Sequence, residues 1–323
     1  MPRLRSLTLI AALFAGLAAP ASAQQTLTAP GPEGELAGTL VTPKPDHPLV
    51  LIIPGSGMTD RDGNNPLAVT AAPYRLLADA LQQRGIGTLR IDKRGMFGSK
   101  AATADPNAVT IADYVADTAS WIESARAQIA IDCVWLLGHS EGAIVALAAA
   151  QELDNLCGVI LVTAPGRPMG TVLREQLHAN PANAPLLEGV DAAIAELEAG
   201  RRVDVESLHP LLGRLFAPTV QGFMIDLMAH DPAQLAAATD VPLLIVHGGN
   251  DLQIAADDAA ALRAGAPDAE FVEIDAMNHV FKEVPADDPF ANRASYADAS
   301  LPVAPALVEA VAEFVMRPRG EEN

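Results

Sequence analysis

The chain has 323 residues, half of them apolar, which is enough to build one large hydrophobic core. The formal net charge is −19 and the acidic residues are spread along the chain, so the surface would repel phosphate backbones and we expect no nucleic-acid partner. The same composition excludes a disordered or a fibrous protein.

The first 23 residues have the three parts of a secretory signal peptide. Arg3 and Arg5 precede an apolar run, Leu7 to about Ala19, and a small-x-small cleavage site ends at Ala23. The alternative is a membrane anchor, but the run is shorter than the roughly 20 apolar residues that a spanning helix needs. We therefore expect cleavage before Gln24, export to the periplasm or medium, and no stable membrane insertion.

Fully apolar strands then alternate with helices along the chain. Strands that are apolar on both faces are typical of a parallel sheet with helices on both sides, so the pattern predicts an α/β fold. The expected strands are 34–43, 48–53, 87–91, 134–137 and 159–162, and the expected helices are 74–84, 111–127 and 141–153.

The alternation stops between Gly166 and about Asp240, where the pattern predicts helices only: 171–179, 186–198 and 211–230. It returns with strands 242–246 and 270–274 and helices 255–264 and 306–316. A helical block inserted between two sheet strands is typical of a lid over the carboxyl ends of the strands. We predict a core of residues 24–165 and 240–323 that carries a helical lid, residues 166–239. The apolar face within 211–228 would pack on the sheet or line an acyl pocket.

The pattern Gly138-His139-Ser140-Glu141-Gly142 lies directly after an apolar strand and directly before an Ala-rich helix. A serine on such a strained strand-to-helix turn needs small neighbours, and its hydroxyl stands exposed above the sheet. The helix N-terminus beneath it favours developing negative charge. Ser140 is therefore the candidate nucleophile.

A serine hydroxyl needs a base to take its proton, and in this fold the chain order is serine, acid, histidine. His279 is the candidate base because it alone lies beyond the last expected strand. Asp251, after the Gly248-Gly249 turn, is the candidate acid, with Asp275 as the alternative. Asp257 and Asp258 fall on the next helix and are expected to face solvent. The remaining histidines, expected in surface or packing roles, are His47, His139, His178, His209, His230 and His247.

An oxyanion hole requires two backbone N–H donors. One is expected from Glu141, the residue after the nucleophile, and the other from the glycine-containing loop that follows strand 48–53. Ser56 is the first choice in that loop and Gly57 the second. An ordinary turn would explain the glycines equally well, but not their position after a central strand.

Two cysteines, Cys133 and Cys157, each lie seven residues before the end of an apolar run, at Ser140 and Ala164. If the two runs are neighbouring parallel strands, the sulfurs start at the same level of the sheet. A disulfide and a pair of buried free thiols both remain open.

Four motifs together resemble those of bacterial α/β-hydrolase esterases, and the resemblance covers about residues 36–315. They are GHSEG, HGGND, MNHVFK and the loop GSGMTDRDG that starts at Gly55. In such a fold the lid is inserted after the sixth strand. The resemblance implies a carboxylesterase that acts on short acyl esters without a metal or an organic cofactor. Two positions depart from the pattern: Met58 stands where proline is usual, and Phe97 where glycine is common.

The sequence therefore predicts a serine hydrolase that cleaves small esters of short to medium acyl chains through an acyl-enzyme on Ser140. A peptidase or an acyltransferase with the same three residues is the alternative, since lid and pocket select the leaving group and acceptor. A binding protein that has lost the chemistry is a third. Arg61 and Asp62, in the loop after strand 48–53, are expected to brace that loop rather than bind substrate.

Overall fold

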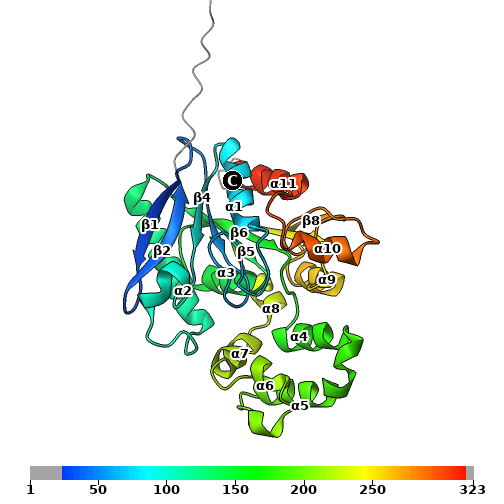
Figure 1. The fold of residues 1–323 in the computed structure, drawn as a ribbon. Coiled ribbons are helices and arrows are strands. Elements are labelled where there is room, and N and C mark those ends of the chain that lie inside the picture. Colours follow the sequence, from blue (N-terminus) through cyan, green and yellow to red (C-terminus); the bar gives the residue numbers. More distant parts are fainter. Residues whose placement is uncertain (1–23, 318–323) are drawn as a thin grey trace, which may run out of the picture.

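An eight-stranded sheet crosses the described part of the chain, residues 24–317, in a computed structural model (Figure 1). Its strand order is β1-β2-β4-β3-β5-β6-β7-β8. Strand β2 is antiparallel to β1 and β4, whereas the pairs from β4 to β8 are parallel, which confirms the predicted α/β class. The strands are β1 (Gln24–Pro30), β2 (Glu35–Val41), β3 (Leu49–Ile53), β4 (Gly87–Ile91), β5 (Val134–His139), β6 (Leu156–Val162), β7 (Leu243–Gly248) and β8 (Glu270–Ile274).

Strand β1 was not predicted from the sequence. It is an edge strand that pairs along its whole length with β2, from Gln24 opposite Val41 to Pro30 opposite Glu35. Only Leu27 and Ala29 are buried in it, so it offers no apolar run. The predicted signal peptide lies outside the described residues. No helix within residues 24–317 is long and apolar enough to cross a membrane.

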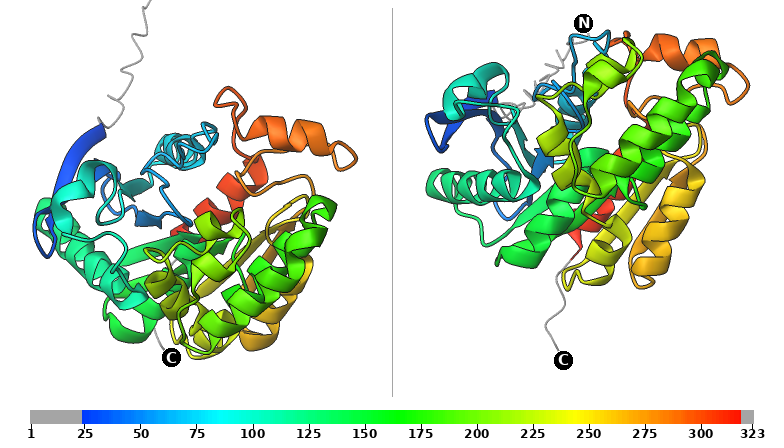
Figure 2. Two further views of the ribbon diagram at one scale, coloured as in Figure 1. Left: turned by 60° about the horizontal axis from the view of Figure 1, so that its bottom comes forward. Right: turned by 90° about the horizontal axis from the view of Figure 1, so that it is seen from below.

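Helices cover both faces of the sheet (Figure 2). Because side chains alternate along a strand, Leu49 and Leu51 of β3 pack in the cluster that contains α2 and α3, while Val50 and Ile52 pack against α1 and α11. The helices around the sheet are α1 (Pro73–Gln83), α2 (Ile111–Gln128), α3 (Glu141–Glu152), α9 (Ala256–Gly265), α10 (Pro289–Ser295) and α11 (Pro305–Met316), and a 3-10 helix spans Phe97–Ala102.

A helical segment separates β6 from β7. It contains α4 (Met169–His178), α5 (Leu187–Glu198), α6 (Leu212–Leu215), α7 (Gln221–Met228) and α8 (Pro232–Ala237), with short 3-10 helices at Pro181–Leu186 and Val205–Ser207. In Figure 1 α4 to α7 form a group below the sheet.

The prediction of one helix over 211–230 was wrong. The segment is divided into α6 and α7, and Pro218 lies between them, where a ring without an N–H group disfavours a continuous helix. Its apolar face is divided as well. Leu212, Phe216 and Met228 are buried in a separate core within the inserted helices, whereas Leu227 belongs to the main core.

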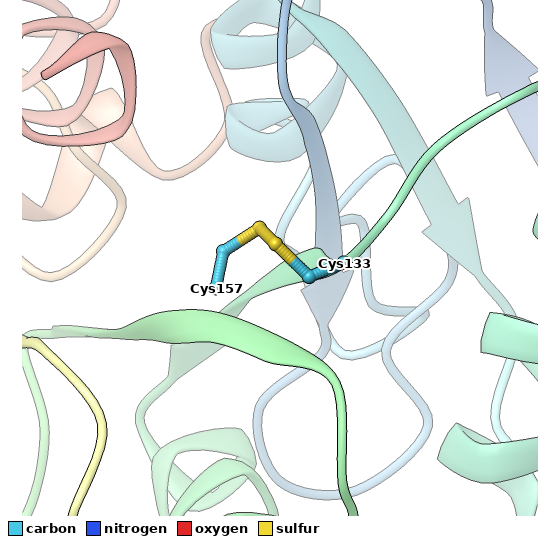
Figure 3. The surroundings of a disulfide bond; sticks show 2 residues. All are labelled: Cys133 and Cys157. Atoms are coloured by element: carbon cyan, nitrogen blue, oxygen red, sulfur yellow. A yellow bond between two sulfur atoms is a disulfide. The ribbon is translucent and has the colours of Figure 1, made fainter. Parts of the chain in front are cut away.

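Cys133 and Cys157 form a disulfide, with a Cα–Cα distance of 5.2 Å (Figure 3). Cys133 precedes β5 and Cys157 is the second residue of β6, and these neighbouring strands run parallel. The bridge therefore joins the amino ends of two central strands, at the edge of the sheet opposite Ser140.

We expect reduction of this bridge to lower stability without changing turnover. Closing a loop with a sequence separation of 24 residues stabilises the folded state by about 3 kcal/mol in the chain-entropy description. Thermal unfolding with and without dithiothreitol measures the loss, and a Cys133→Ala/Cys157→Ala variant should be insensitive to the reductant. An equal melting temperature for both forms of the wild type would contradict the prediction.

Candidate active site

Ser140 lies between the end of β5 and the start of α3, on a backbone with φ 53° and ψ −124°. Non-glycine residues rarely adopt this conformation, and strain of this kind is typical of functional turns. The two flanking glycines have a steric reason. A Cβ atom on Gly138 would clash with the backbone of Gly142 and Ala143, and one on Gly142 would clash with the carbonyl oxygen of Ile53.

The structure brings Asp251 and His279 together. His279 Nδ1 lies 2.8 Å from Asp251 Oδ2, and the exposed fractions of the two side chains are 7% and 0%. The other carboxylate oxygen, Oδ1, accepts hydrogen bonds from the backbone N–H groups of Gln253 and Ile254. A carboxylate can only accept, so Nδ1 is the donor nitrogen, and Nε2 is the nitrogen with the lone pair in the neutral ring. The alternative acid, Asp275, is solvent-exposed.

Asn278 shapes the loop that carries His279. Its side-chain oxygen accepts hydrogen bonds from the backbone N–H groups of Val280 and Lys282, at 3.2 and 3.0 Å. Its amide nitrogen donates to Asn292 Oδ1 and Ser295 Oγ on α10, at 3.0 and 2.7 Å. Neither α10 nor this support was predicted from the sequence, because the seven residues of α10 are too few to show a helical period.

His139, the residue before the nucleophile, links three parts of the site. Its Nε2 lies 3.0 Å from the carbonyl oxygen of His279, which can only accept, so Nε2 carries the proton. Its Nδ1 is then an acceptor, and Tyr74 Oη donates to it over 2.6 Å. Tyr74 Oη in turn accepts a 3.0 Å hydrogen bond from the Gly55 N–H group. The network thus joins the loop after β3, the nucleophile turn and the loop of the candidate base.

Burial sets the charge of this network. It lowers the pKa of His139 well below its ordinary value, and the neighbouring His279 ring, at 4.6 Å between centroids, adds to the effect. Burial likewise raises the pKa of Tyr74 above that of a free phenol. Both groups are therefore neutral in the folded protein near pH 7. From the sequence, His139 was expected to have only a surface or packing role, and no role was predicted for Tyr74.

The loop after β3 presents Ser56, Gly57 and Met58 to solvent. Gly57 has φ 68°, a left-handed conformation that favours glycine. Thr59 closes the turn, since its hydroxyl donates to the carbonyl oxygen of Ser56 and its N–H group to that of Gly57, both at 2.9 Å. The turn leaves both expected donor residues, Ser56 and Gly57, facing outward.

A buried ion pair that was not predicted from the sequence lies behind this loop. Lys93 Nζ is 3.2 Å from Glu141 Oε1 and 2.7 Å from the carbonyl oxygen of Gly55. Only 3% of each charged side chain is exposed. Glu141 follows the nucleophile, so one ammonium group contacts both segments from which the oxyanion donors were expected.

Ion pairs brace the rest of the loop after β3. The Arg61 guanidinium binds the carboxylate of Asp92, which also accepts a 2.8 Å hydrogen bond from the Arg61 N–H group. Arg90, buried in β4, pairs with Asp62. The expected structural role of Arg61 and Asp62 agrees with these contacts. Phe97, five residues after Asp92, has φ 42°, a left-handed conformation that favours glycine.

The expectation that Asp258 faces solvent was wrong. Its side chain is fully buried and accepts hydrogen bonds from the backbone N–H groups of Gly166 and Arg167, and from the Arg167 guanidinium. It therefore fastens the start of the inserted helices to α9. Among residues 24–317, no three His, Cys, Asp or Glu side chains gather as metal ligands would.

A cavity of about 870 Å³ lies away from these residues. It is lined by residues near the amino ends of β3, β5 and β6, including Leu49, Cys133 and Cys157. Ser140 follows the carboxyl end of β5, so this cavity is not part of the same site.

A mostly parallel sheet, a strained serine after its central strand and an Asp–His pair on the loops after β7 and β8 define an α/β-hydrolase. The chain belongs to the serine aminopeptidase S33 family (Hydrolase_4), whose family model matches residues 67–283. That match includes Ser140, Asp251 and His279 but not the loop that carries Ser56.

Esterase EstD from Thermotoga maritima is 28% identical over 254 residues, which are 76% of this chain and 58% of that protein. The chain thus spans little more than half the length of this relative. The esterase domain of a Rhodothermus marinus protein has a TM-score of 0.52 at 19% identity, with 91% of this chain and 100% of that chain covered. Est1E from Butyrivibrio proteoclasticus has a TM-score of 0.56 at 17% identity, with 90% and 97% covered. The two structures share the fold.

We expect the neutral, buried His139 to make the folded protein less stable in mild acid. Below the ordinary histidine pKa of 6.5 the unfolded chain binds a proton that the folded chain does not, so the free energy of unfolding falls as the pH falls. Between about pH 7 and 5.5 this group should account for about 1 kcal/mol of the loss.

Urea unfolding of wild type and a His139→Asn variant at both pH values measures the difference. The variant should lose that part of the pH dependence, whereas His209→Asn, at an exposed histidine, should retain it. Equal pH dependence in wild type and His139→Asn would show that His139 takes up its proton in the folded state as readily as in the unfolded chain, which would contradict the prediction.

Proposed function

We propose that this protein is a serine carboxylesterase that cleaves esters of short to medium acyl chains, with Ser140 as nucleophile, His279 as base and Asp251 as the acid that orients it. The observation that carries the proposal is the 2.8 Å contact between His279 Nδ1 and Asp251 Oδ2. It leaves Nε2 as the ring nitrogen that can accept a proton. Ser140 occupies the strained turn at the same edge of the sheet.

In the first half of the reaction, Ser140 Oγ attacks the ester carbonyl carbon and its proton passes to His279 Nε2. The carbonyl oxygen becomes an oxyanion, which accepts hydrogen bonds from the backbone N–H groups of Glu141 and Ser56. Glu141 is the first residue of α3, and the first N–H groups of a helix have no partner within it. The imidazolium then gives its proton to the leaving alcohol, and the acyl group remains on Ser140.

In the second half, His279 takes a proton from water while the water oxygen attacks the acyl carbon. The oxyanion forms again in the same place and collapses, which breaks the bond to Ser140 Oγ and returns the proton to it. Asp251 orients the ring and stabilises the imidazolium through Oδ2, while a backbone N–H group holds its Oδ1 in place. The cycle needs no metal or organic cofactor.

The likeness to Esterase EstD supports an ester as the substrate. The family description, serine aminopeptidase, favours a second candidate: an aminopeptidase that uses the same three residues on an amide bond. The two activities differ in the leaving group, which His279 must protonate more completely for an amine than for an alkoxide.

The inserted helices support the preference for short or medium chains. We infer that residues 166–239 act as a lid, and several of their largest apolar side chains, including Phe216 and Met228, are already buried in the core of the insertion itself. Fewer apolar groups are then left to line a long acyl channel. Large apolar side chains are also exposed: Leu211, at 68%, in the insertion, and Met58 and Leu67, at 55% and 88%, in the loop after β3.

We also propose export after cleavage at Ala23. Cleavage there would keep all of the described strand β1, Gln24–Pro30, in the mature protein. The Cys133–Cys157 disulfide is compatible with an oxidising compartment.

Treatment with a fluorophosphonate probe, together with p-nitrophenol release from the acetate, butyrate, octanoate and palmitate esters, tests the proposed function. Wild type should be labelled and should turn over the acetate or butyrate fastest, while Ser140→Ala should lose labelling and activity. Fastest turnover of palmitate would refute the chain-length preference. Greater activity on amino-acid p-nitroanilides would favour the aminopeptidase, and a folded wild type without labelling would favour a binding protein.

Asp251→Asn separates the two candidate acids. An asparagine cannot hold the required tautomer, so kcat should fall about 10³- to 10⁴-fold while KM changes little. Asp275→Asn is the matched control, since Asp275 is exposed and has no contact with His279 among the described residues; its kcat should stay within about twofold of wild type. A large loss in Asp275→Asn and not in Asp251→Asn would reverse the assignment.

A further inference from the structure

Lys93 occupies an unusual position for a buried lysine, between the loop after β3 and the start of α3. It comes two residues after β4 ends at Ile91, and β4 pairs in parallel with β3. The carboxyl ends of these strands therefore meet at the same edge of the sheet, which brings the Lys93 side chain to the carbonyl oxygen of Gly55 at 2.7 Å. The aromatic ring of Tyr114, with its centroid 5.5 Å from Nζ, covers the ammonium group.

The contact with Gly55 fixes the direction of the Ser56 N–H group. The carbonyl of Gly55 and the N–H of Ser56 belong to one planar peptide unit, and the described residues contain no cis peptide bond. In a trans unit the two groups point in opposite directions. Because the carbonyl points into the protein toward Lys93, the Ser56 N–H group points away from it, toward the exposed side of the loop.

The preceding peptide unit is held as well. The Gly55 N–H group donates to Tyr74 Oη, so the units on both sides of Gly55 have buried partners. There is little room at Gly55 for a side chain. A Cβ atom on Gly55 would lie 3.2 Å from His139 Nδ1 and 3.3 Å from Ser140 Cβ. The turn that presents Ser56 is therefore pressed against the nucleophile turn.

The second contact of Lys93 reaches the other donor segment. Its Nζ lies 3.2 Å from the carboxylate of Glu141, in the first turn of α3, where the helix dipole favours a negative group. Gly142, in the same turn, is so close to β3 that a Cβ atom there would clash with the carbonyl oxygens of Ile53 and Pro54. One ammonium group thus joins the residues expected to supply both N–H donors.

We propose that Lys93 is a positioning residue of the oxyanion hole, which sets the orientation of the Ser56 N–H group and holds it at a fixed distance from that of Glu141. This inference rests on the proposed function, because an oxyanion forms only if Ser140 attacks a carbonyl group. Lys93 acts through geometry rather than through its charge, since the carboxylate of Glu141 neutralises that charge locally. The oxyanion itself meets only backbone donors.

Two variants separate the geometric role from the charge. Lys93→Met removes the donor to Gly55 but leaves Glu141 buried without its cation, whereas Lys93→Met/Glu141→Gln removes both charges. Loss of one oxyanion donor costs about 10²- to 10³-fold in kcat, and a misdirected donor should cost less, about 10- to 100-fold, with KM within about threefold of wild type. We expect the loss in both variants.

The measurements are kcat and KM on p-nitrophenyl acetate per active site, counted by complete fluorophosphonate labelling, so that misfolded protein does not contribute. A trifluoromethyl ketone, which forms an oxyanion on the nucleophile, should bind more weakly in proportion to the loss of kcat/KM. A merely structural role would lower the number of active sites and leave both quantities unchanged. Recovery of wild-type kcat in the double variant would overturn the geometric role in favour of a charge effect.

Arg94→Gln is the matched control. Arg94 neighbours Lys93 in the chain and is also buried, but its guanidinium pairs with Asp113 and Asp117 of α2, away from Gly55. It should lower the melting temperature and leave kcat per active site unchanged. Wild type that neither labels nor turns over ester would defeat the proposed function and this inference together. Active wild type with unchanged kcat in Lys93→Met would defeat this inference alone.

Discussion

The parallel alignment of the central strands is the constraint on which the site depends. Strands β3, β4, β5, β7 and β8 all end at the same edge, so the segments that follow them meet there although they are up to about 220 residues apart in the chain. Ser56, Lys93, Ser140, Asp251 and His279 each come from a different one of these segments. The disulfide and the large cavity lie at the opposite edge, which separates the stabilisation of the sheet from its chemistry.

Buried polar groups turn this meeting of loops into a defined geometry. A carbonyl oxygen can only accept, so the contact of His139 with the His279 backbone fixes one tautomer and thereby the direction of the bonds through Tyr74 to Gly55. Lys93 satisfies the other side of Gly55. A buried group without such partners would be costly, so the network holds together only in one arrangement. Rigid supports of this kind are what a strained serine and a preorganised oxyanion hole require.

The inserted helices are more independent of the sheet than a simple cover would be. They bury their own apolar cluster, and polar contacts fasten them to the core: Arg167 with Asp258 at the start, and Asp226 with the Ile111 N–H group near the end. Leu227 and Ala236 of the insertion also pack in the main core, so the insertion is anchored by apolar as well as polar contacts.

The sequence by itself determined the α/β class, and it indicated the candidate nucleophile in GHSEG and favoured Asp251 over the alternative Asp275, because apolar runs and glycines at a tight turn are local signals. Two features could not be predicted from such signals. Strand β1 has only two buried residues and therefore no apolar run, and residues 211–230 have the pattern of one helix although the structure divides them. Only the tertiary structure decided that Cys133 and Cys157 pair, that Asp258 is buried, and that His139, Tyr74 and Lys93 belong to the site. Each of these depends on a partner distant in the chain. The types and spacing of neighbouring residues do not indicate which partner the fold brings close.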